Sequence, residues 1–268
     1  DFSLTWNNTD FQNRIVAQSG QQKMEIDYFN FQQATGFSGD GRTAATQPSL
    51  AQLQAWVADP RSDKDIIRDP DDILSILQVN GLGSANAESV EVTAYDMQGT
   101  YRFSLDNIGD FRIGLQATFI DEFLYQDDPA QPIVDGAGNY NDVTGAAPEL
   151  PEWKVNLTTG WTRGNHSIVA ITRYVDEVLN YDGPTYTFMR SFGGTTLRTV
   201  DSIRAWTQLD ANYTYRGLSV LDGELSFTVG SRNLFDREAQ KTPEFAGVAG
   251  ALQDPMGRVI YARLVYDF

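Results

Sequence analysis

The twelve residues Gly257-Arg-Val-Ile-Tyr-Ala-Arg-Leu-Val-Tyr-Asp-Phe268 decide how the rest of the chain is interpreted. Every second residue counted back from Phe268 is apolar or aromatic, whereas Asp267, Arg263 and Tyr261 occupy the alternate positions. A period of two residues is typical of a β-strand, because successive side chains of a strand point to opposite faces. One face of this strand is therefore expected to meet an apolar environment and the other face water.

The same alternation recurs along the chain and predicts about eight strands. Besides the last segment, it covers residues 2–7, 95–103, 111–119, 153–161, 166–175, 204–215 and 224–232. Short links at 104–110, 163–165 and 216–223 alternate strictly with long links at 16–87, 126–150, 180–200 and 236–256. This order of links is typical of a transmembrane β-barrel, which has short periplasmic turns and long extracellular loops.

Aromatic residues flank the apolar stretch of several strands, as Trp153 and Trp161 do, and Phe111 and Phe119. A soluble β-sandwich also alternates, but it gathers its aromatic residues in mid-strand, within its core. Eight residues at ~3.3 Å with a tilt near 45° span roughly 19 Å, close to the ~25 Å apolar band of a membrane barrel. We therefore expect an all-β, antiparallel transmembrane β-barrel. The residues expected to face lipid are Trp153, Trp161, Phe111, Phe119, Tyr213, Tyr266 and Phe268.

The composition excludes several classes of protein. The chain has 268 residues, no cysteine and a net charge of −16, so disulfides and thiolate metal sites are ruled out. Such an acidic chain does not fit a nucleic-acid-binding protein, which needs clustered Lys and Arg for phosphate. A mean hydropathy of −0.36, without any run near the ~18 apolar residues that a spanning helix needs, argues against helical membrane spans.

Catalytic and cofactor signals are weak, and we expect neither an enzyme nor a bound cofactor. His166 is the only histidine, and Ser167 beside it points to the opposite face of a strand, so the two cannot form a catalytic pair. The segment Gly81-Leu-Gly-Ser-Ala-Asn86 lacks the third glycine of a dinucleotide fingerprint. Residues 135–142 offer spaced oxygen atoms without the EF-hand pattern, so a solvated loop is favoured there over a calcium site.

Four segments in order resemble the C-terminal barrel region of TonB-dependent outer-membrane receptors. They are Gly230–Asp236, Asp254–Arg258, Pro151–Asn156 and Trp206–Asp210. In that family an Asn-Leu-Phe-Asp sequence ends the penultimate strand and a Gly-Arg sequence begins the last one. The matching residues are Asn233, Leu234, Phe235 and Asp236, followed by Gly257 and Arg258. The resemblance implies that this chain forms about eight C-terminal strands of a larger barrel of 22 strands, without the family's plug domain and TonB-contacting segment.

The resemblance also implies a function, a location and partners. It predicts an active-transport receptor in the outer membrane of a Gram-negative bacterium. Such a receptor binds a scarce small-molecule nutrient, an oligosaccharide or a siderophore, and imports it with TonB-derived energy. The expected partners are outer-membrane lipid and lipopolysaccharide, the TonB complex, which the missing N-terminal part would contact, and the barrel-assembly machinery, which would read Leu264, Tyr266 and Phe268. The alternative is a small stand-alone outer-membrane barrel of about eight strands with a structural or adhesive role.

The long extracellular loop at 16–87 has predicted structure of its own. Ser49-Leu-Ala-Gln52 is a capping box that predicts a helix at 50–58, ended by Asp59-Pro60. The β-branched stretch Ile73–Val79 is interpreted as a strand that forms a hairpin with Met24–Phe29.

Three further groups of residues receive roles from this interpretation. Loop aromatic residues could stack on a ligand or pack the loops; these are Trp56, Tyr140, Tyr181, Tyr186 and Phe188. Acidic loop residues keep the loops solvated; these are Asp59, Asp63, Asp65, Asp69, Asp71, Asp72, Asp127, Asp128, Asp135 and Asp142. Lumen-facing polar residues would contact water or a plug; these are Arg102, Arg112, Lys154, Arg173, Asp210, Arg232 and Arg263.

Overall fold

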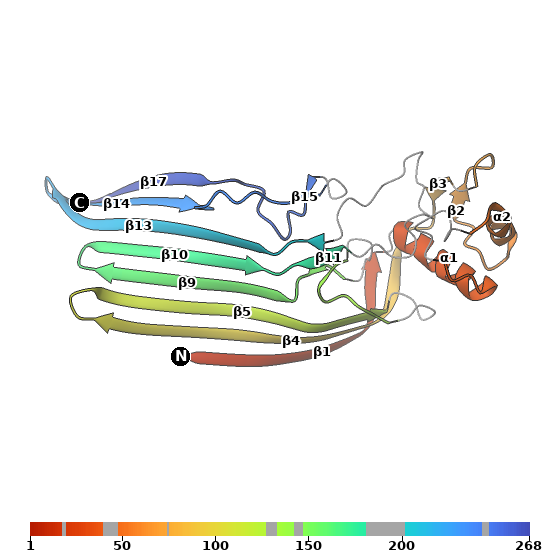
Figure 1. The fold of residues 1–268 in the computed structure, drawn as a ribbon, viewed down its shortest axis with the longest axis horizontal. Helices are drawn as coiled ribbons and strands as arrows, with labels where there is room; N and C mark the ends of the chain where they lie inside the picture. The colour runs from red at the N-terminus through yellow and green to blue at the C-terminus, as the bar shows by residue number, and fades with distance from the viewer. Residues whose placement is uncertain are drawn as a thin grey trace.

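One antiparallel sheet of long strands dominates the fold (Figure 1). The computed structural model describes residues 1–17, 20–39, 48–73, 75–126, 133–141, 147–180, 202–242 and 247–268. The long strands are β1 (Phe2–Ala17), β4 (Ser84–Leu105), β5 (Gly109–Gln126), β9 (Trp153–Arg163), β10 (His166–Val175), β13 (Trp206–Val220), β14 (Gly223–Arg232) and β17 (Val259–Asp267). They pair antiparallel in the order β1-β4-β5-β9-β10-β13-β14-β17. The predicted all-β, antiparallel fold is confirmed, and each alternating segment overlaps one of these strands.

Because each long strand pairs with the next one along the chain, the sheet is a meander with two different ends. Tight turns join β4 to β5, β9 to β10 and β13 to β14 at one end, which we call the short-turn end (Figure 1). Asn107, Gly164 and Leu221 adopt positive φ in these turns. The helices and short strands gather at the opposite end, the long-loop end. Neither helix of the described chain is long and apolar enough to cross a membrane.

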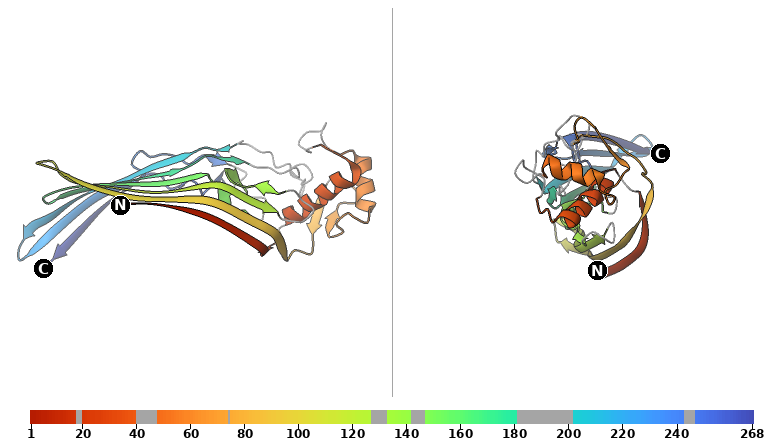
Figure 2. Two further views of the ribbon diagram at one scale, coloured as in Figure 1. Left: turned by 90° about the horizontal axis from the view of Figure 1, so that it is seen from below. Right: turned by 90° about the vertical axis from the view of Figure 1, so that its right-hand side faces the viewer.

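Between the short turns and the level of Phe119, the strand register separates an apolar face from a polar face. Phe111 of β5 lies opposite Trp161 of β9, and Gln116 lies opposite Asn156 on the other face. Two hollows open on the polar face, and the sheet is visibly curved, so the polar face is concave (Figure 2). The sheet is open, since β1 and β17 form its edges and do not pair with each other.

A β-bulge in β5 exchanges the two faces for the side chains that follow it, toward the long-loop end. Two residues of β5, Asp121 among them, stand where β4 has one, because Thr93 pairs with Glu122 whereas Ala94 pairs with Ile120. Beyond this bulge Phe123 therefore turns to the concave face. There it joins a buried apolar cluster of Val90, Phe123, Tyr125, Ala147 and Leu150.

A small subdomain interrupts the chain between β1 and β4. It contains α1 (Gly20–Thr35), α2 (Leu50–Ala58), β2 (Ile66–Arg68) and β3 (Ile76–Val79). The predicted helix at 50–58 and its capping box are confirmed. The backbone N–H of Gln52 donates to Ser49 Oγ, and the side-chain Oε1 of Gln52 accepts from the backbone N–H of Ser49. The helix ends at Asp59, whose backbone N–H bonds to Trp56 O.

The predicted hairpin between Met24–Phe29 and Ile73–Val79 is wrong. Met24–Phe29 lies inside α1, and β3 pairs with β2. Met24, Tyr28 and Phe31 are buried at intervals of four and three residues, the spacing of one face of a helix. The polar residues Lys23 and Asp27 lie on the same face and obscure this helical period in the sequence.

The long-loop end is built from short strands. These are β6 (Val134–Asp135), β7 (Asn139–Tyr140), β8 (Glu149–Leu150), β11 (Val178–Asn180), β12 (Ser202–Ile203), β15 (Lys241–Thr242) and β16 (Gly247–Val248). A buried cluster of Tyr140, Val178, Ile203, Ala249 and Leu252 joins four separate loop segments into one packed body. Each buried apolar cluster of the described residues thus includes loop or subdomain residues. The half of the sheet next to the short turns, which we call the turn half, has no described element packed on either face (Figures 1 and 2).

Candidate functional site

The apolar face of the sheet is unusually exposed, most of all at the edges. On β1, Phe2 is 71% exposed and Trp6 is 62% exposed; on β17, Ile260 and Leu264 are 71% and 66% exposed. Exposed apolar side chains recur on this face from β1 to β17, whereas monomeric soluble proteins rarely expose contiguous apolar patches larger than a few hundred Å². Such a surface indicates contact with a membrane or with another protein.

Two rows of aromatic residues border this apolar face. The row at the long-loop side runs across four strands through Trp6, Tyr95, Phe119 and Trp153. The Phe119 ring stacks on Trp153 at 4.6 Å and on Tyr95 at 6.1 Å between ring centroids. Cross-strand contacts of this kind each contribute a fraction of a kcal/mol and fix the rings side by side.

The second aromatic row lies toward the short turns and contains Phe103, Phe111 and Trp161. Phe103 and Phe111 stack at 5.0 Å, and Trp161 Nε1 donates to Ile108 O at 2.9 Å. Eight residues separate Phe111 from Phe119 along β5, which corresponds to roughly 26 Å of strand. The apolar face is therefore a band of defined height between two aromatic rows.

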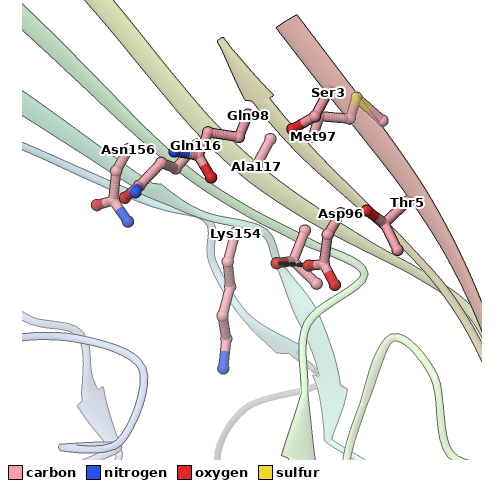
Figure 3. A pocket seen from close by; sticks show the side chains of 10 residues that line it. Ser3, Thr5, Asp96, Met97, Gln98, Gln116, Ala117, Lys154 and Asn156 are labelled. Atoms are coloured by element: carbon pink, nitrogen blue, oxygen red, sulfur yellow. Dashed lines mark hydrogen bonds between the residues drawn. The ribbon is translucent and has the colours of Figure 1, made fainter. Parts of the chain in front are cut away.

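The concave face carries a polar hollow of about 470 Å³ (Figure 3). The register aligns Gln98, Gln116 and Asn156 in one row across three strands. In the next row the Asp96 carboxylate accepts a hydrogen bond from Thr118 Oγ1 at 2.7 Å. Lys154 points into the hollow. These side chains offer hydrogen bonds to water, to a polar solute or to a polar protein surface.

A second hollow of about 450 Å³ lies on the same face, over β13, β14 and β17. Arg216 and Arg263 line it together with Thr214 and Thr228, whose hydroxyl oxygens are 2.9 Å apart. The lumen-facing role predicted for Arg263 and Lys154 agrees with their position on the concave face. The wall of a lumen requires a closed barrel, and the described sheet is open.

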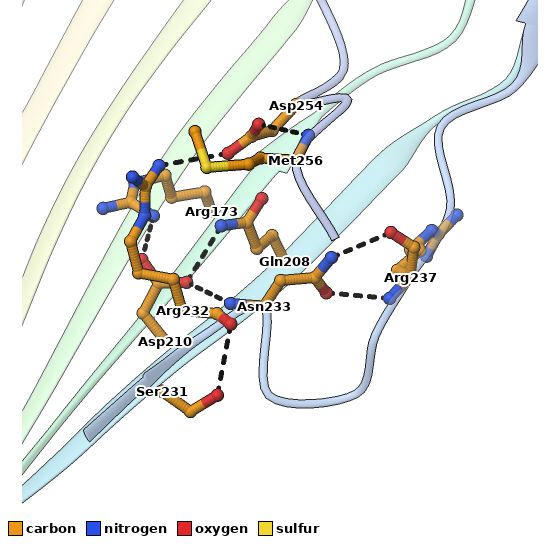
Figure 4. Close-up of polar contacts among 9 residues, drawn as sticks. All are labelled: Arg173, Gln208, Asp210, Ser231, Arg232, Asn233, Arg237, Asp254 and Met256. Atoms are coloured by element: carbon orange, nitrogen blue, oxygen red, sulfur yellow. Dashed lines mark hydrogen bonds and ion pairs between the residues drawn. The ribbon is translucent and has the colours of Figure 1, made fainter. Parts of the chain in front are cut away.

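The Asn-Leu-Phe-Asp sequence forms the turn that ends β14 (Figure 4). Asn233 is buried and adopts a φ of +49°. Its side chain closes the turn twice, since Nδ2 donates to Arg237 O and Oδ1 accepts from Arg237 N, both at 2.8 Å. The Leu234 amide donates to Leu209 O at 2.7 Å, while Phe235 is 76% exposed. The short amide of Asn suits a left-handed residue that must also cap a turn.

Asp210 of β13 holds this turn against the concave face (Figure 4). Its carboxylate accepts from the Asn233 backbone N–H and from Gln208 Nε2, each at 2.9 Å, and pairs with Arg173. Sequence reasoning placed Asp210 on the polar face but did not find this role. Its partner Asn233 is 23 residues from Asp210 in the sequence, so no local sequence pattern predicts the contact.

The two predicted motifs meet in space. The Asp236 carboxylate accepts a hydrogen bond from the Arg258 backbone N–H at 2.8 Å and lies 3.8 Å from its guanidinium. Gly257 leaves room for this approach, because a Cβ there would stand 3.2 Å from Asp236 Oδ1. The ion pair between Arg232 and Asp254 lies nearby at 3.1 Å. The motifs therefore fasten the end of β14 to the start of β17.

The loop aromatic residues that fall within the described chain are buried. Trp56 is 2% exposed, and its indole Nε1 donates to Asp27 at 3.1 Å. Tyr140 is 7% exposed in the cluster that joins the loops. Burial favours the packing alternative for both. The other three candidates, Tyr181, Tyr186 and Phe188, lie outside the described residues. Of the expected assembly signal, Leu264, Tyr266 and Phe268 are all exposed.

Charged residues of the subdomain do more than keep it solvated. Lys23 is nearly buried and lies 2.5 Å from Asp65 and 3.5 Å from Asp63. Burial disfavours the charge of its ammonium, but these two carboxylates outweigh that effect and raise the pKa of Lys23. The Asp59 carboxylate pairs with Arg61, whose hydrogen bonds lower the pKa of Asp59. Through their contacts with Lys23, Asp63 and Asp65 thus hold the 63–65 segment against α1.

Sequence reasoning missed Asp27, which is 3% exposed in α1. Its carboxylate accepts from the Asp63 backbone N–H at 2.8 Å and from the Trp56 indole. Burial raises the pKa of Asp27, although these two hydrogen bonds and nearby Arg68 partly oppose the increase. The signal that could have marked it is its position on the same helix face as Met24, Tyr28 and Phe31, three to four residues from Met24 and Phe31.

His166 begins β10, and its Nδ1 lies 2.7 Å from the Tyr213 hydroxyl. Ser167 points to the other face of the strand, as expected. No group of three or more His, Asp or Glu side chains in the described part of the chain could hold a metal ion. Asp135 accepts hydrogen bonds from the Phe123 and Ala137 amides. It therefore has a structural role at the start of the segment considered for calcium, whose last residue, Asp142, is outside the described chain.

No protein-family model matches the chain, and no curated protein matches it either.

Proposed function

We propose that this chain forms part of the wall of an outer-membrane β-barrel receptor. The receptor binds a scarce nutrient, an oligosaccharide or a siderophore, and imports it with TonB-derived energy. The observation that carries the proposal is the exposed apolar face bordered by two aromatic rows. Roughly 26 Å of strand between the rows, tilted by 35–45°, spans roughly 20 Å of the ~25 Å apolar band of such barrels.

Two further observations support a membrane wall. The polar face is concave and bears Lys, Arg and amide side chains, as the wall of an aqueous lumen would. The short turns lie at one end and folded loops at the other, which is the asymmetry between the periplasmic and extracellular sides of these barrels (Figure 1). A soluble sandwich would instead bury one face of the sheet under a second layer.

The open sheet favours the receptor over the stand-alone barrel of about eight strands. A small barrel would close by pairing β1 with β17, and these strands do not pair. Unpaired edges of this length need further strands, since an exposed edge is prone to aggregate. The TonB part of the proposal rests on the resemblance of the terminal motifs to that receptor family, and the contact between Asp236 and Arg258 is consistent with those motifs acting as one unit.

A knockout tests the proposal. Loss of the gene should abolish energy-dependent uptake and slow growth on iron-limited or glycan-limited medium, while growth on rich medium stays normal. A protonophore should remove uptake in the wild type to the level of the knockout. Normal uptake in both media would contradict the receptor function, and recovery of the protein in the soluble fraction would contradict the membrane wall.

A further inference from the structure

A guanidinium and an imidazole stand together at the short-turn border of the apolar face. Arg163, the last residue of β9, pairs directly with His166, the first residue of β10. Both belong to the apolar face, because Trp161 and Ile168, each two residues further into its strand, lie on it. We call Arg163, His166 and the neighbouring Tyr215 the short-turn rim.

The rim is organised by aromatic contacts around His166. Its Nδ1 is 2.7 Å from the Tyr213 hydroxyl, and its ring meets Tyr215 edge-on at 5.1 Å. When the Tyr213 hydroxyl donates to Nδ1, the neutral ring keeps its proton on Nε2, which becomes a donor. Within the described chain, neither Nε2 nor the Arg163 guanidinium has a hydrogen-bond partner. Two donors therefore stand side by side where the apolar face ends.

The opposite border of the same face has the opposite charge. Beyond the row of Trp6 and Trp153, the residues that continue the apolar face include Asp10, which pairs with Glu91, and Glu122, which pairs with Thr93. These carboxylates repel an anion, whereas the short-turn rim attracts one. The two borders of the band are therefore suited to different surroundings.

We propose that the short-turn rim binds the phosphate of an anionic phospholipid. The inference rests on the proposed membrane function. The planar guanidinium of Arg163 matches phosphate oxygens, and the His166 ring supplies a second donor. Trp161, Tyr213 and Tyr215 lie at the level where aromatic residues meet lipid head groups, and the adjoining apolar band receives the acyl chains.

The test uses the protein produced from its complete gene and reconstituted in vesicles. Phosphatidylglycerol added to phosphatidylcholine vesicles should raise the denaturant midpoint of unfolding of the wild type. The double variant Arg163→Gln with His166→Phe should lose nearly all of this increase, taken as the difference between its own midpoints in the two kinds of vesicle. High salt should weaken the wild-type increase. Arg112→Gln is the control for the loss of a positive charge, because Arg112 lies on the concave face, opposite Gly160 of β9.

The outcomes separate this inference from the proposed function. An equal increase in the wild type and the double variant would overturn lipid binding at the rim while leaving the membrane wall intact. An equal increase from free glycerol phosphate would overturn recognition of a lipid, because a soluble anion would suffice. Failure of the protein to insert into either kind of vesicle would overturn both proposals.

Discussion

The sheet and the long-loop end of this molecule are stabilised in different ways. The long-loop end buries Tyr28, Phe31, Leu53 and Trp56 in a core like that of any water-soluble domain. The turn half of the sheet has no such core, and its apolar side chains point outward. The loops and subdomain therefore gain their stability from their own packing, whereas the sheet needs apolar surroundings.

The largest effect is expected in the core of the subdomain. Phe31 is fully buried and contacts Trp56 at 5.8 Å between ring centroids. Phe31→Ala should lower the free energy of unfolding of the subdomain by about 3–5 kcal/mol, because it removes buried surface and leaves a cavity. Leu50→Ala on the exposed side of α2 should change it by less than about 0.5 kcal/mol. Denaturant unfolding followed by tryptophan fluorescence would measure both, and similar losses would contradict a packed core.

The sheet should respond to charge on one face only. Leu157→Arg places a cation on the apolar face near the middle of β9 and should cost about 2–4 kcal/mol for the protein in vesicles. Asn156→Arg, one residue away on the concave face, should cost much less. The free energies of unfolding from lipid vesicles would test this. If both faces tolerate arginine equally, the apolar face does not meet lipid.

The turn after β14 should depend on both the side chain and the backbone of Asn233. Asn233→Ala removes two hydrogen bonds and leaves in the left-handed conformation a residue without the polar side chain that lets Asn adopt it, for a loss of about 1–3 kcal/mol. Asn233→Gly removes the same bonds without that strain and should cost about 1 kcal/mol less. Equal unfolding free energies for the two variants would argue against a strained turn.

The strands could be predicted from sequence because a period of two residues persists over many residues of each. The bulge at Asp121 could not be predicted, because it depends on how β5 pairs with β4 and not on which residues β5 contains. The bulge turns Phe123 and Tyr125 to the concave face. Helix α1 was missed because Lys23 and Asp27 interrupt the apolar face that the helix buries.

The contacts of the candidate site were still less predictable. The motifs at 233–236 and 257–258 were recognised, but their union depends on the pairing of Asp236 with the Arg258 backbone across 22 residues. Local sequence carries no record of such pairings. Closure into a barrel is equally invisible, because the local sequence of β1 and β17 does not show what each of these edge strands pairs with.

The smallest effect expected is a pair of opposite pH dependences within the subdomain. The pKa of Asp27 is raised by burial, so its contribution to stability is present below its unfolded pKa near 3.8 and is lost as pH rises through the folded pKa. The pKa of Asp59 is lowered by its hydrogen bonds with Arg61, so its contribution is present above that unfolded value and is lost as the pH falls.

Asp27→Asn and Asp59→Asn separate these two contributions. With rising pH above about 4, the stability of the wild type should fall relative to Asp27→Asn. With falling pH below about 4, the wild type should lose stability relative to Asp59→Asn, by a small amount because Asp59 and Arg61 lie at the surface. Unfolding free energies of all three proteins measured between pH 3 and 7 would show the two slopes. Slopes of the same sign would contradict the different environments of the two carboxylates, one in the core of the subdomain and one in water.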